Sequence, residues 1–121
     1  MLKKLNKIAR AVAAAEKAKG RIEAVFVSDA VIRKLNKKFR KADRATDVLS
    51  FEIAQDGILG QIVISKDTAK RNAKRYGVSF DEEVKRLAVH GALHLAGYDH
   101  AGKSDRMLMR EKEDHYAKKI R

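Results

Sequence analysis

The segment from His90 to His100 constrains the fold of this chain more than any other, because it holds three of the four histidines. His90 and His94 are four residues apart, so on a helix both imidazoles project from the same face. Gly97 follows where a left-handed glycine commonly ends a helix, and a turn there would bring His100 back toward the other two. The spacing therefore predicts a three-imidazole metal site with one coordination position open, as a catalytic zinc requires.

The residue after His90 argues against the commonest enzyme class with two helical histidines. Zinc proteases carry HExxH, whose glutamate is the general base, and this chain has Gly91 at that position. Gly91 instead indicates close approach of another backbone or of a substrate. Zinc is the expected metal because three imidazoles suit it, although other divalent transition metals bind such a set as well or better.

Composition limits the ligands and the compartment. The chain has no cysteine, which excludes disulfides and thiolate ligands and fits a reducing cytosol. No apolar run is long enough to span a bilayer, and the N-terminus shows no secretory signal pattern. We therefore expect a cytoplasmic protein without membrane contact. With 121 residues, no proline and no internal repeat, the chain is expected to form one domain over residues 1–121.

Positive charge is concentrated in the first third of the chain. The formal net charge is +12, and residues 1–41 hold 13 of the 28 Lys and Arg residues but only 3 of the 16 Asp and Glu residues. Lysine-rich faces often serve only solubility. Combined with a candidate hydrolytic metal site, an excess of this size favours a polyanion such as nucleic acid as the partner.

Apolar periodicity predicts five helices and three strands, hence an α+β fold with a small sheet covered mainly on one face. The expected helices are 1–19, one capped by Ser28 or Asp29, 65–77, one from the Ser79–Glu82 capping box through the histidines, and one from Ser104 or Asp105 through Tyr116. The expected strands are 22–27, 46–53 and 58–64, the last two forming a hairpin around Asp56–Gly57. The basic segment 1–19 reads as an organellar transit segment or, as we favour, a packed surface helix.

Residues 90–100, HGALHLAGYDH, resemble the H-G-x-L-H-L-x-G-Y-D-H signature of the YbeY family of bacterial metal-dependent endoribonucleases. Two further blocks are similar to that family in order and spacing: LNKKFR followed by a short loop and TDVLSFEI, and LGQIVIS. The resemblance covers residues 22 to about 116. It implies a mixed three- to four-stranded sheet, about five helices, and a zincin-like metal site on a helix and the following turn.

The resemblance also implies an activity and partners. These are zinc-dependent endonucleolytic cleavage of single-stranded RNA in 16S ribosomal RNA maturation and ribosome quality control, with ribosomal RNA, small-subunit ribosomal proteins and an assembly GTPase as partners. It assigns zinc to His90, His94 and His100. It assigns catalytic roles to His90, to His94 and to Arg40 in the loop before the second strand. Such a guanidinium can stabilise the negative charge that develops during phosphodiester cleavage.

Other residues near these blocks receive weaker roles. Asp99 is a hydrogen-bond acceptor for an imidazole N–H or the base for the attacking water, and we favour the former. Tyr98 is expected to be a packed wall and His115 a surface residue, while Thr46, Asp47 and Ser50 contact RNA or serve the strand. The expected RNA-binding residues are Lys37, Lys38, Arg40, Lys41 and Arg44.

The chain departs from the family pattern in three ways. Gln61 replaces the usual Asp after Leu-Gly, which puts any carboxylate role at this position in doubt. Ala45 replaces the usual Pro before the second strand block, which is expected to loosen the loop carrying Arg40. The family's opening strand is missing, so a sheet with three strands and an exposed edge is expected.

Two other classes of function remain open from the sequence. One is a non-catalytic RNA- or ribosome-binding protein with a structural metal. The other is a metal-dependent hydrolase of another substrate, for which the net charge of +12 favours an anionic compound and Gly91 disfavours a peptide.

Overall fold

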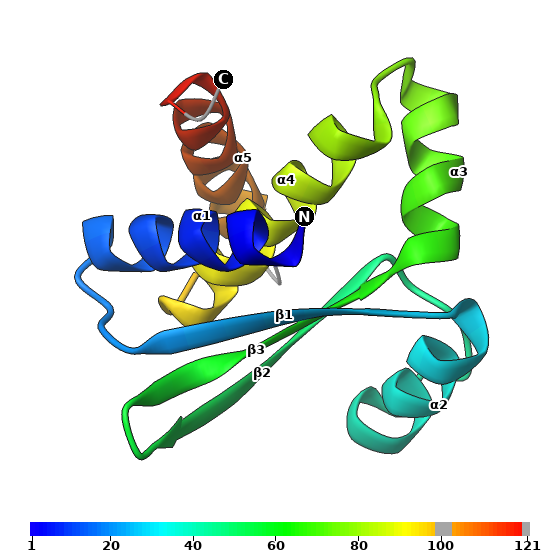
Figure 1. Ribbon diagram of the computed structural model, residues 1–121, viewed down its shortest axis with the longest axis horizontal. Helices are drawn as coiled ribbons and strands as arrows, with labels where there is room; N and C mark the ends of the chain where they lie inside the picture. The colour runs from blue at the N-terminus through cyan, green and yellow to red at the C-terminus, as the bar shows by residue number, and fades with distance from the viewer. Residues whose placement is uncertain (99–102, 120–121) are drawn as a thin grey trace.

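A computed structural model describes residues 1–98 and 103–119 and gives an α+β fold, as predicted (Figure 1). The elements in chain order are α1 (Leu2–Ala15), β1 (Arg21–Val27), α2 (Asp29–Arg40), β2 (Val48–Gln55), β3 (Ile58–Ser65), α3 (Lys66–Tyr76), α4 (Phe80–Leu95) and α5 (Lys103–Lys119). Each predicted element is present, with ends that shift by a few residues.

The sheet is mixed and, within the described residues, has three strands in the order β1-β3-β2. β1 runs parallel to β3, while β2 and β3 form the predicted antiparallel hairpin. Asp56 and Gly57 at its turn both have positive φ, 53° and 76°, the combination that lets a two-residue turn follow the twist of its strands. The central position of β3 places its side chains in contact with both layers of helices.

The larger layer of helices covers one face of the sheet. Figure 1 shows α1 and α4 crossing this face with α5 beyond them, while α2 lies on the opposite side. Residues alternate along the strands accordingly: Ile62 and Ile64 belong to the main core with α1 and α4, whereas Val63 packs with Ile32 of α2 and Leu49 of β2. The prediction of a sheet covered mainly on one face is confirmed.

Helix α1 is a packed part of the domain, as favoured over a transit segment, because Leu5, Ile8 and Val12 are buried against α4 and the sheet. It ends earlier than the predicted residue 19. Lys17 has a left-handed φ of 66°, and the Ala18 N–H donates to the Ala13 carbonyl, which closes the helix.

Serine side chains start three helices as the sequence predicts. The hydroxyls of Ser28, Ser65 and Ser79 accept from the backbone N–H groups of the residues three positions ahead. Gly77 ends α3 in the left-handed conformation, and Gly97 after α4 has φ 105°. These local signals fix the start of α4 and the point where the histidine helix must turn.

Candidate active site

Two of the predicted ligands, His90 and His94, lie on one face of α4. Their imidazole rings are half-buried, with centroids 4.8 Å apart and planes inclined at 68°. The helix approaches the sheet closely at Gly91, where an added Cβ would lie 2.9–3.0 Å from three carbons of Ile62. Gly91 thus serves close approach, although the neighbour is a side chain of β3 and not a backbone or substrate.

Arg40 and both histidines line one hollow of about 510 Å³. The hollow lies between the end of α2, the start of β2 and α4. Its other lining residues are Asn36, Ala42, Arg44, Thr46, Asp47, Val48, Leu49 and Ser50. A second hollow of about 390 Å³ shares Arg40, Ser50 and His94 and adds Phe51, Glu52 and Leu95. The structure therefore brings together the guanidinium and imidazoles that the sequence analysis selected.

Arg40 is the last residue of α2, not part of the loop as expected, because the helix continues until Lys41 adopts a left-handed φ of 57°. An Nη2–H group of Arg40 donates to the Ser50 carbonyl at 2.7 Å, and its guanidinium carbon lies 5.2 Å from the centroid of the Phe51 ring. Helix, hydrogen bond and cation–π contact together restrict the guanidinium before any substrate arrives.

The buried Asn36, one helical turn before Arg40, organises the loop that follows. Its Nδ2–H donates to the Arg44 carbonyl at 3.0 Å, and its own carbonyl accepts from Ala42 N–H at 3.3 Å. An ion pair between Arg33 and Asp43 adds a further contact at the surface. The loop therefore has hydrogen bonds that hold it although Ala45 stands where the resemblance implies a proline.

Ser50 connects the two walls of the site. Its hydroxyl donates to the Gly91 carbonyl at 3.2 Å, while its own carbonyl accepts from Arg40. The residue thus touches both the arginine and the histidine helix. Sequence reasoning had left it between an RNA contact and a strand residue, and the observed contacts show a structural link between the two.

Asp47, the residue before β2, lines the hollow and has partners on α3 and α4. Its Oδ2 lies 3.4 Å from Asn72 Nδ2 and 3.8 Å from an Arg86 nitrogen. Arg86 also donates two hydrogen bonds to the buried Glu83, at 2.9 and 2.8 Å. The bonds to Glu83 and the negative charges of Glu83, Asp47 and Glu113 raise the pKa of Arg86 above its ordinary value.

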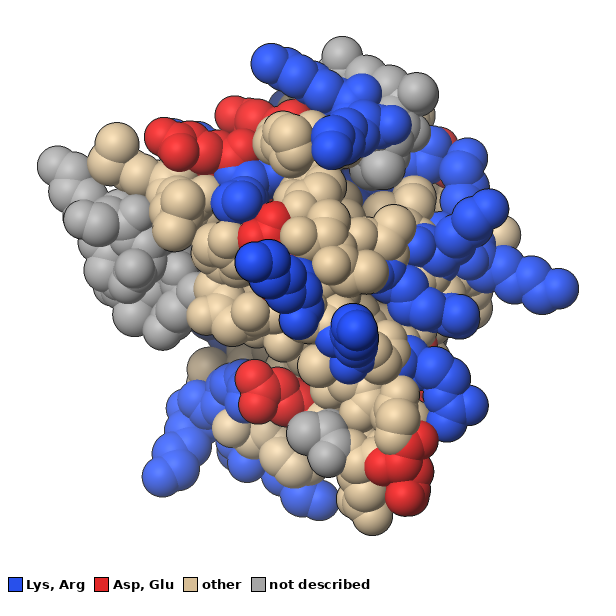
Figure 2. All heavy atoms as spheres, turned by 90° about the vertical axis from the view of Figure 1, so that its left-hand side faces the viewer, with Lys and Arg blue, Asp and Glu red and all other residues tan. Residues whose placement is uncertain are grey.

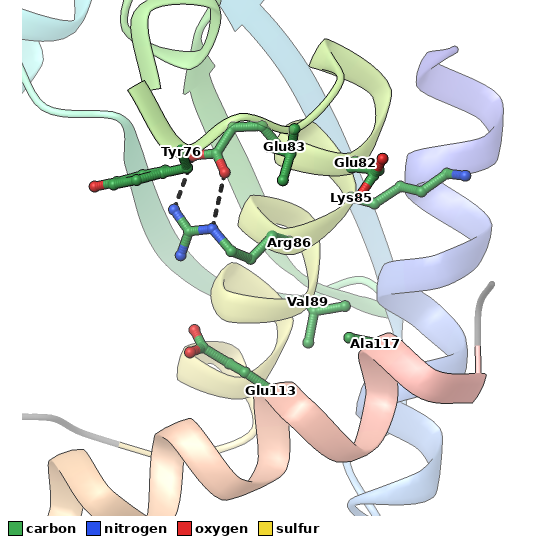
Figure 3. A pocket seen from close by; sticks show the side chains of 9 residues that line it. Tyr76, Glu82, Glu83, Lys85, Arg86, Val89, Glu113 and Ala117 are labelled. Atoms are coloured by element: carbon green, nitrogen blue, oxygen red, sulfur yellow. Dashed lines mark hydrogen bonds and ion pairs between the residues drawn. The ribbon is translucent and has the colours of Figure 1, made fainter. Parts of the chain in front are cut away.

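Glu113 is the residue near the histidines that sequence reasoning missed. Its Oε1 contacts Nδ1 of His90 across 23 residues of sequence, from α5 to α4. Figure 3 shows its side chain on α5, lining a third hollow, of about 470 Å³, that Arg86 and Glu83 also line. The available signal was its spacing from Met109 and Tyr116, which are both buried on α5.

The structure places the expected RNA-binding residues around the end of α2. Lys37 and Lys38 are exposed in its last turn, Lys41 follows directly, and Arg44 lines the hollow with Arg40. Figure 2 shows many Lys and Arg side chains on another side of the molecule, with several Asp and Glu side chains between them. The positive surface therefore extends well beyond the end of α2.

Two predicted site residues, His100 and Asp99, lie outside the described residues, as does any metal cluster that includes them. Within the described ranges 1–98 and 103–119, no group of three or more His, Cys, Asp or Glu gathers around one point. Tyr98 packs against the core and its hydroxyl donates to Glu16, so the prediction of a packed wall is confirmed. His115 is exposed on α5, as expected.

Gln61 lies in the middle of β3, paired with Glu23 of β1 and Phe51 of β2. Its neighbour Ile62 faces Gly91 and the histidine helix. Because successive side chains of a strand point to opposite faces, Gln61 lies on the face turned away from that helix. The departure that the resemblance indicated at Gln61 therefore lies away from the histidine face of the sheet.

Comparison with known proteins identifies the family of the chain. A family model described as Endoribonuclease YbeY matches residues 1–121. Curated proteins named Endoribonuclease YbeY are similar: one from Nautilia profundicola is 50% identical over 101 residues (82% of this chain, 71% of that protein). One from Desulforamulus reducens is 48% identical over 100 residues (74% and 65%). The chain thus spans slightly less than two thirds of the latter's length.

A solved structure has a similar fold. The solution structure of TM1509 from Thermotoga maritima superposes with a TM-score of 0.69 at 31% sequence identity, covering 98% of this chain and 80% of that one. In the described part of the chain, no helix combines the length and the apolar character needed to cross a membrane.

Proposed function

Because the chain belongs to the YbeY endoribonuclease family, we propose that it cleaves single-stranded RNA in a metal-dependent reaction. The observation that carries the proposal is the hollow that Arg40 shares with His90 and His94. It combines a cation suited to phosphate with two imidazoles suited to a divalent metal. In keeping with the family resemblance, we place the reaction in 16S ribosomal RNA maturation in the cytoplasm, alongside ribosomal proteins of the small subunit and an assembly GTPase.

The ligands that we propose have donor chemistry suited to a zinc ion. His90 and His94 present two neighbouring imidazoles, and Glu113 engages Nδ1 of His90, as carboxylates commonly do for metal-binding histidines. His100 is proposed as the third ligand. When bound, zinc would polarise a phosphate oxygen or lower the pKa of a bound water.

Arg40 supplies the charge that the phosphodiester requires. Cleavage builds negative charge on the phosphate oxygens, and a guanidinium can bind two of them through parallel N–H donors. Its contacts with Ser50 and Phe51 hold it in place in advance, so little reorganisation is needed at the moment of reaction. The side chain acts as a preformed clamp on the scissile phosphate.

An aromatic pair beside Arg40 suits a single strand. Phe39 is 51% exposed, and its ring centroid lies 5.3 Å from that of Phe51 in an edge-to-face arrangement. Exposed rings give unstacked bases a surface to stack on, whereas bases in a duplex are already stacked. This pair supports single-stranded RNA as the substrate.

The test separates cleavage from binding in three variants. We expect Arg40→Ala to lower kcat about 100- to 1000-fold, the usual effect of removing one donor to a developing oxyanion, with RNA affinity changed only a few-fold. Arg40→Lys should recover part of kcat, since it restores charge without the bidentate fork. His94→Ala and metal chelation should both abolish cleavage. Arg75→Ala, an exposed arginine of α3, is the matched control.

Two results would contradict the proposal. If Arg40→Ala cuts RNA as fast as the unmodified protein, the catalytic assignment of Arg40 is wrong. If metal-loaded protein binds RNA without cutting it, and the metal leaves only when the protein unfolds, the chain is a binding protein with a structural metal.

A further inference from the structure

We infer that Glu113 is a positioning residue that orients His90 for metal binding. The inference rests on the proposed metal-dependent function and goes beyond it, since it assigns a role to a helix that contributes no predicted ligand. Oε1 of Glu113 and Nδ1 of His90 are in hydrogen-bond contact. Both side chains are largely shielded from water, with exposed fractions of 18% and 23%.

The contact selects one form of the imidazole. A carboxylate accepts hydrogen bonds, so Nδ1 of His90 carries the proton and donates it to Glu113. The lone pair of the neutral ring then resides on Nε2, which is the atom that can bind a metal. Because the contact also limits rotation of the ring, it restrains the plane of His90, which is inclined at 68° to that of His94.

The placement of Glu113 on α5 is set by its buried neighbours. Met109 and Tyr116 are 3% and 6% exposed, and Glu113 lies between them at helical spacing on the same face. A carboxylate in such a stripe is unusual, because charged side chains are rarely shielded without a partner. The apolar packing of Met109 and Tyr116, on either side of Glu113 along α5, therefore places its carboxylate next to His90.

A positive charge also lies near the carboxylate of Glu113. Figure 3 shows Glu113 lining the same hollow as Arg86, whose guanidinium is held by Glu83. Val89 of α4 and Ala117 of α5 also line this hollow. Arg86 lies on α4 one helical turn before His90, so the carboxylate of Glu113 lies near a fixed positive charge as well as near the imidazole.

Zinc affinity is the direct measure of this role. Purified protein would be stripped with a chelator, and zinc binding measured by competition with a chromophoric chelator. Loss of the hydrogen-bond partner of a metal-binding histidine typically weakens metal binding 10- to 100-fold, and we expect this range for Glu113→Ala. The zinc affinity of Glu113→Gln should lie between those of Glu113→Ala and the unmodified protein, because its amide oxygen still accepts the N–H but carries no charge. Glu111→Gln, an exposed glutamate on the same helix, should bind zinc like the unmodified protein.

Two further measurements separate positioning from other roles. Thermal unfolding of the metal-free variants tests whether Glu113 only pairs α4 with α5. A lower Tm with zinc affinity unchanged within twofold would overturn the inference. The absorption spectrum of the Co²⁺-loaded protein tests direct ligation: positioning predicts the same band pattern in Glu113→Gln, and a changed coordination pattern would overturn it.

Cleavage assays on the same samples keep this inference distinct from the proposed function. If the unmodified protein binds zinc but cuts no RNA, the nuclease assignment fails and the zinc affinities still decide the role of Glu113. If the unmodified protein binds no divalent metal, both fail.

Discussion

At the scale of single residues, Gly91 sets how closely the histidine helix approaches the sheet. Replacing it with alanine adds a methyl group within about 3.0 Å of the fully buried Ile62 side chain. Alanine gains roughly 1 kcal/mol from helix propensity, whereas overpacking a core costs roughly 1–3 kcal/mol. We expect the clash to prevail, with Gly91→Ala lowering the Tm by several degrees in thermal unfolding.

A double-mutant cycle tests whether the clash with Ile62 causes the lower stability of Gly91→Ala. Ile62→Val removes one of the three crowded carbons, so Gly91→Ala should cost less stability in that background than alone. Ala14→Gly at an exposed position of α1 measures the propensity contribution by itself. A higher Tm for Gly91→Ala than for the unmodified protein would show that the helix and sheet are not in tight contact.

At the scale of elements, Asp29 joins the N-terminal ends of α2 and α3. Its carboxylate accepts from the hydroxyls of Ser65 and Thr68, both at 2.6 Å, and pairs with Arg71 at 2.7 Å. These hydrogen bonds, those from Ser65 and Thr68 above all, lower the pKa of Asp29 from 3.8 to about 2. The two helices are thus held by an ionised group.

The lowered pKa predicts a pH-dependent stability. The folded state prefers the ionised form, so the contribution of Asp29 is present above pH 4 and is lost as the pH falls toward 2. Urea denaturation should show that Asp29→Asn costs roughly 1–2 kcal/mol at pH 7, allowing for partial exposure, and about half of that at pH 3. Asp114→Asn on α5 controls for the lost charge. A cost that stays constant between pH 7 and pH 3 would contradict the assignment.

Some features of the helices and strands could be predicted from the sequence, and others could not. The hairpin at Asp56–Gly57 and the helical histidine pair depend on local rules of spacing and turn chemistry, and both are found in the structure. The predicted end of α2 was too early, so Arg40 was placed in a loop although it is the last residue of the helix. The reason is that Lys41 ends the helix in a left-handed conformation without a glycine to mark it.

The partners of the site residues depend on distant packing. Glu113 of α5 contacts His90 of α4 across 23 residues of sequence, and Arg86 of α4 pairs with Asp47, which precedes β2. Local periodicity says which face of a helix is buried but not which residue of another helix that face meets. The sequence therefore identified the groups that we propose for the chemistry, and the tertiary structure was needed to find the residues that hold them.

At the scale of the whole molecule, the net charge of +12 predicts strongly salt-dependent RNA binding. Each phosphate contact to a single strand contributes about 0.7 to the slope of log affinity against log salt concentration. If Lys37 and Lys38 contact phosphates, replacing both with glutamine should flatten the slope by roughly 1.4. The measurement is fluorescence anisotropy of a labelled single-stranded RNA over a salt series, in a His94→Ala background so that the RNA stays intact.

A matched pair of double variants tests whether RNA binding depends on the position of the positive charge or only on its total. Lys70 and Lys74 are exposed on α3, so replacing both with glutamine removes the same net charge away from the end of α2. Local contacts predict that this variant keeps the original slope. Long-range attraction alone predicts that both double variants change affinity equally, because the field of a protein depends on its summed charge. Equal slopes would remove the end of α2 from the RNA path and assign binding to the wider positive surface seen in Figure 2.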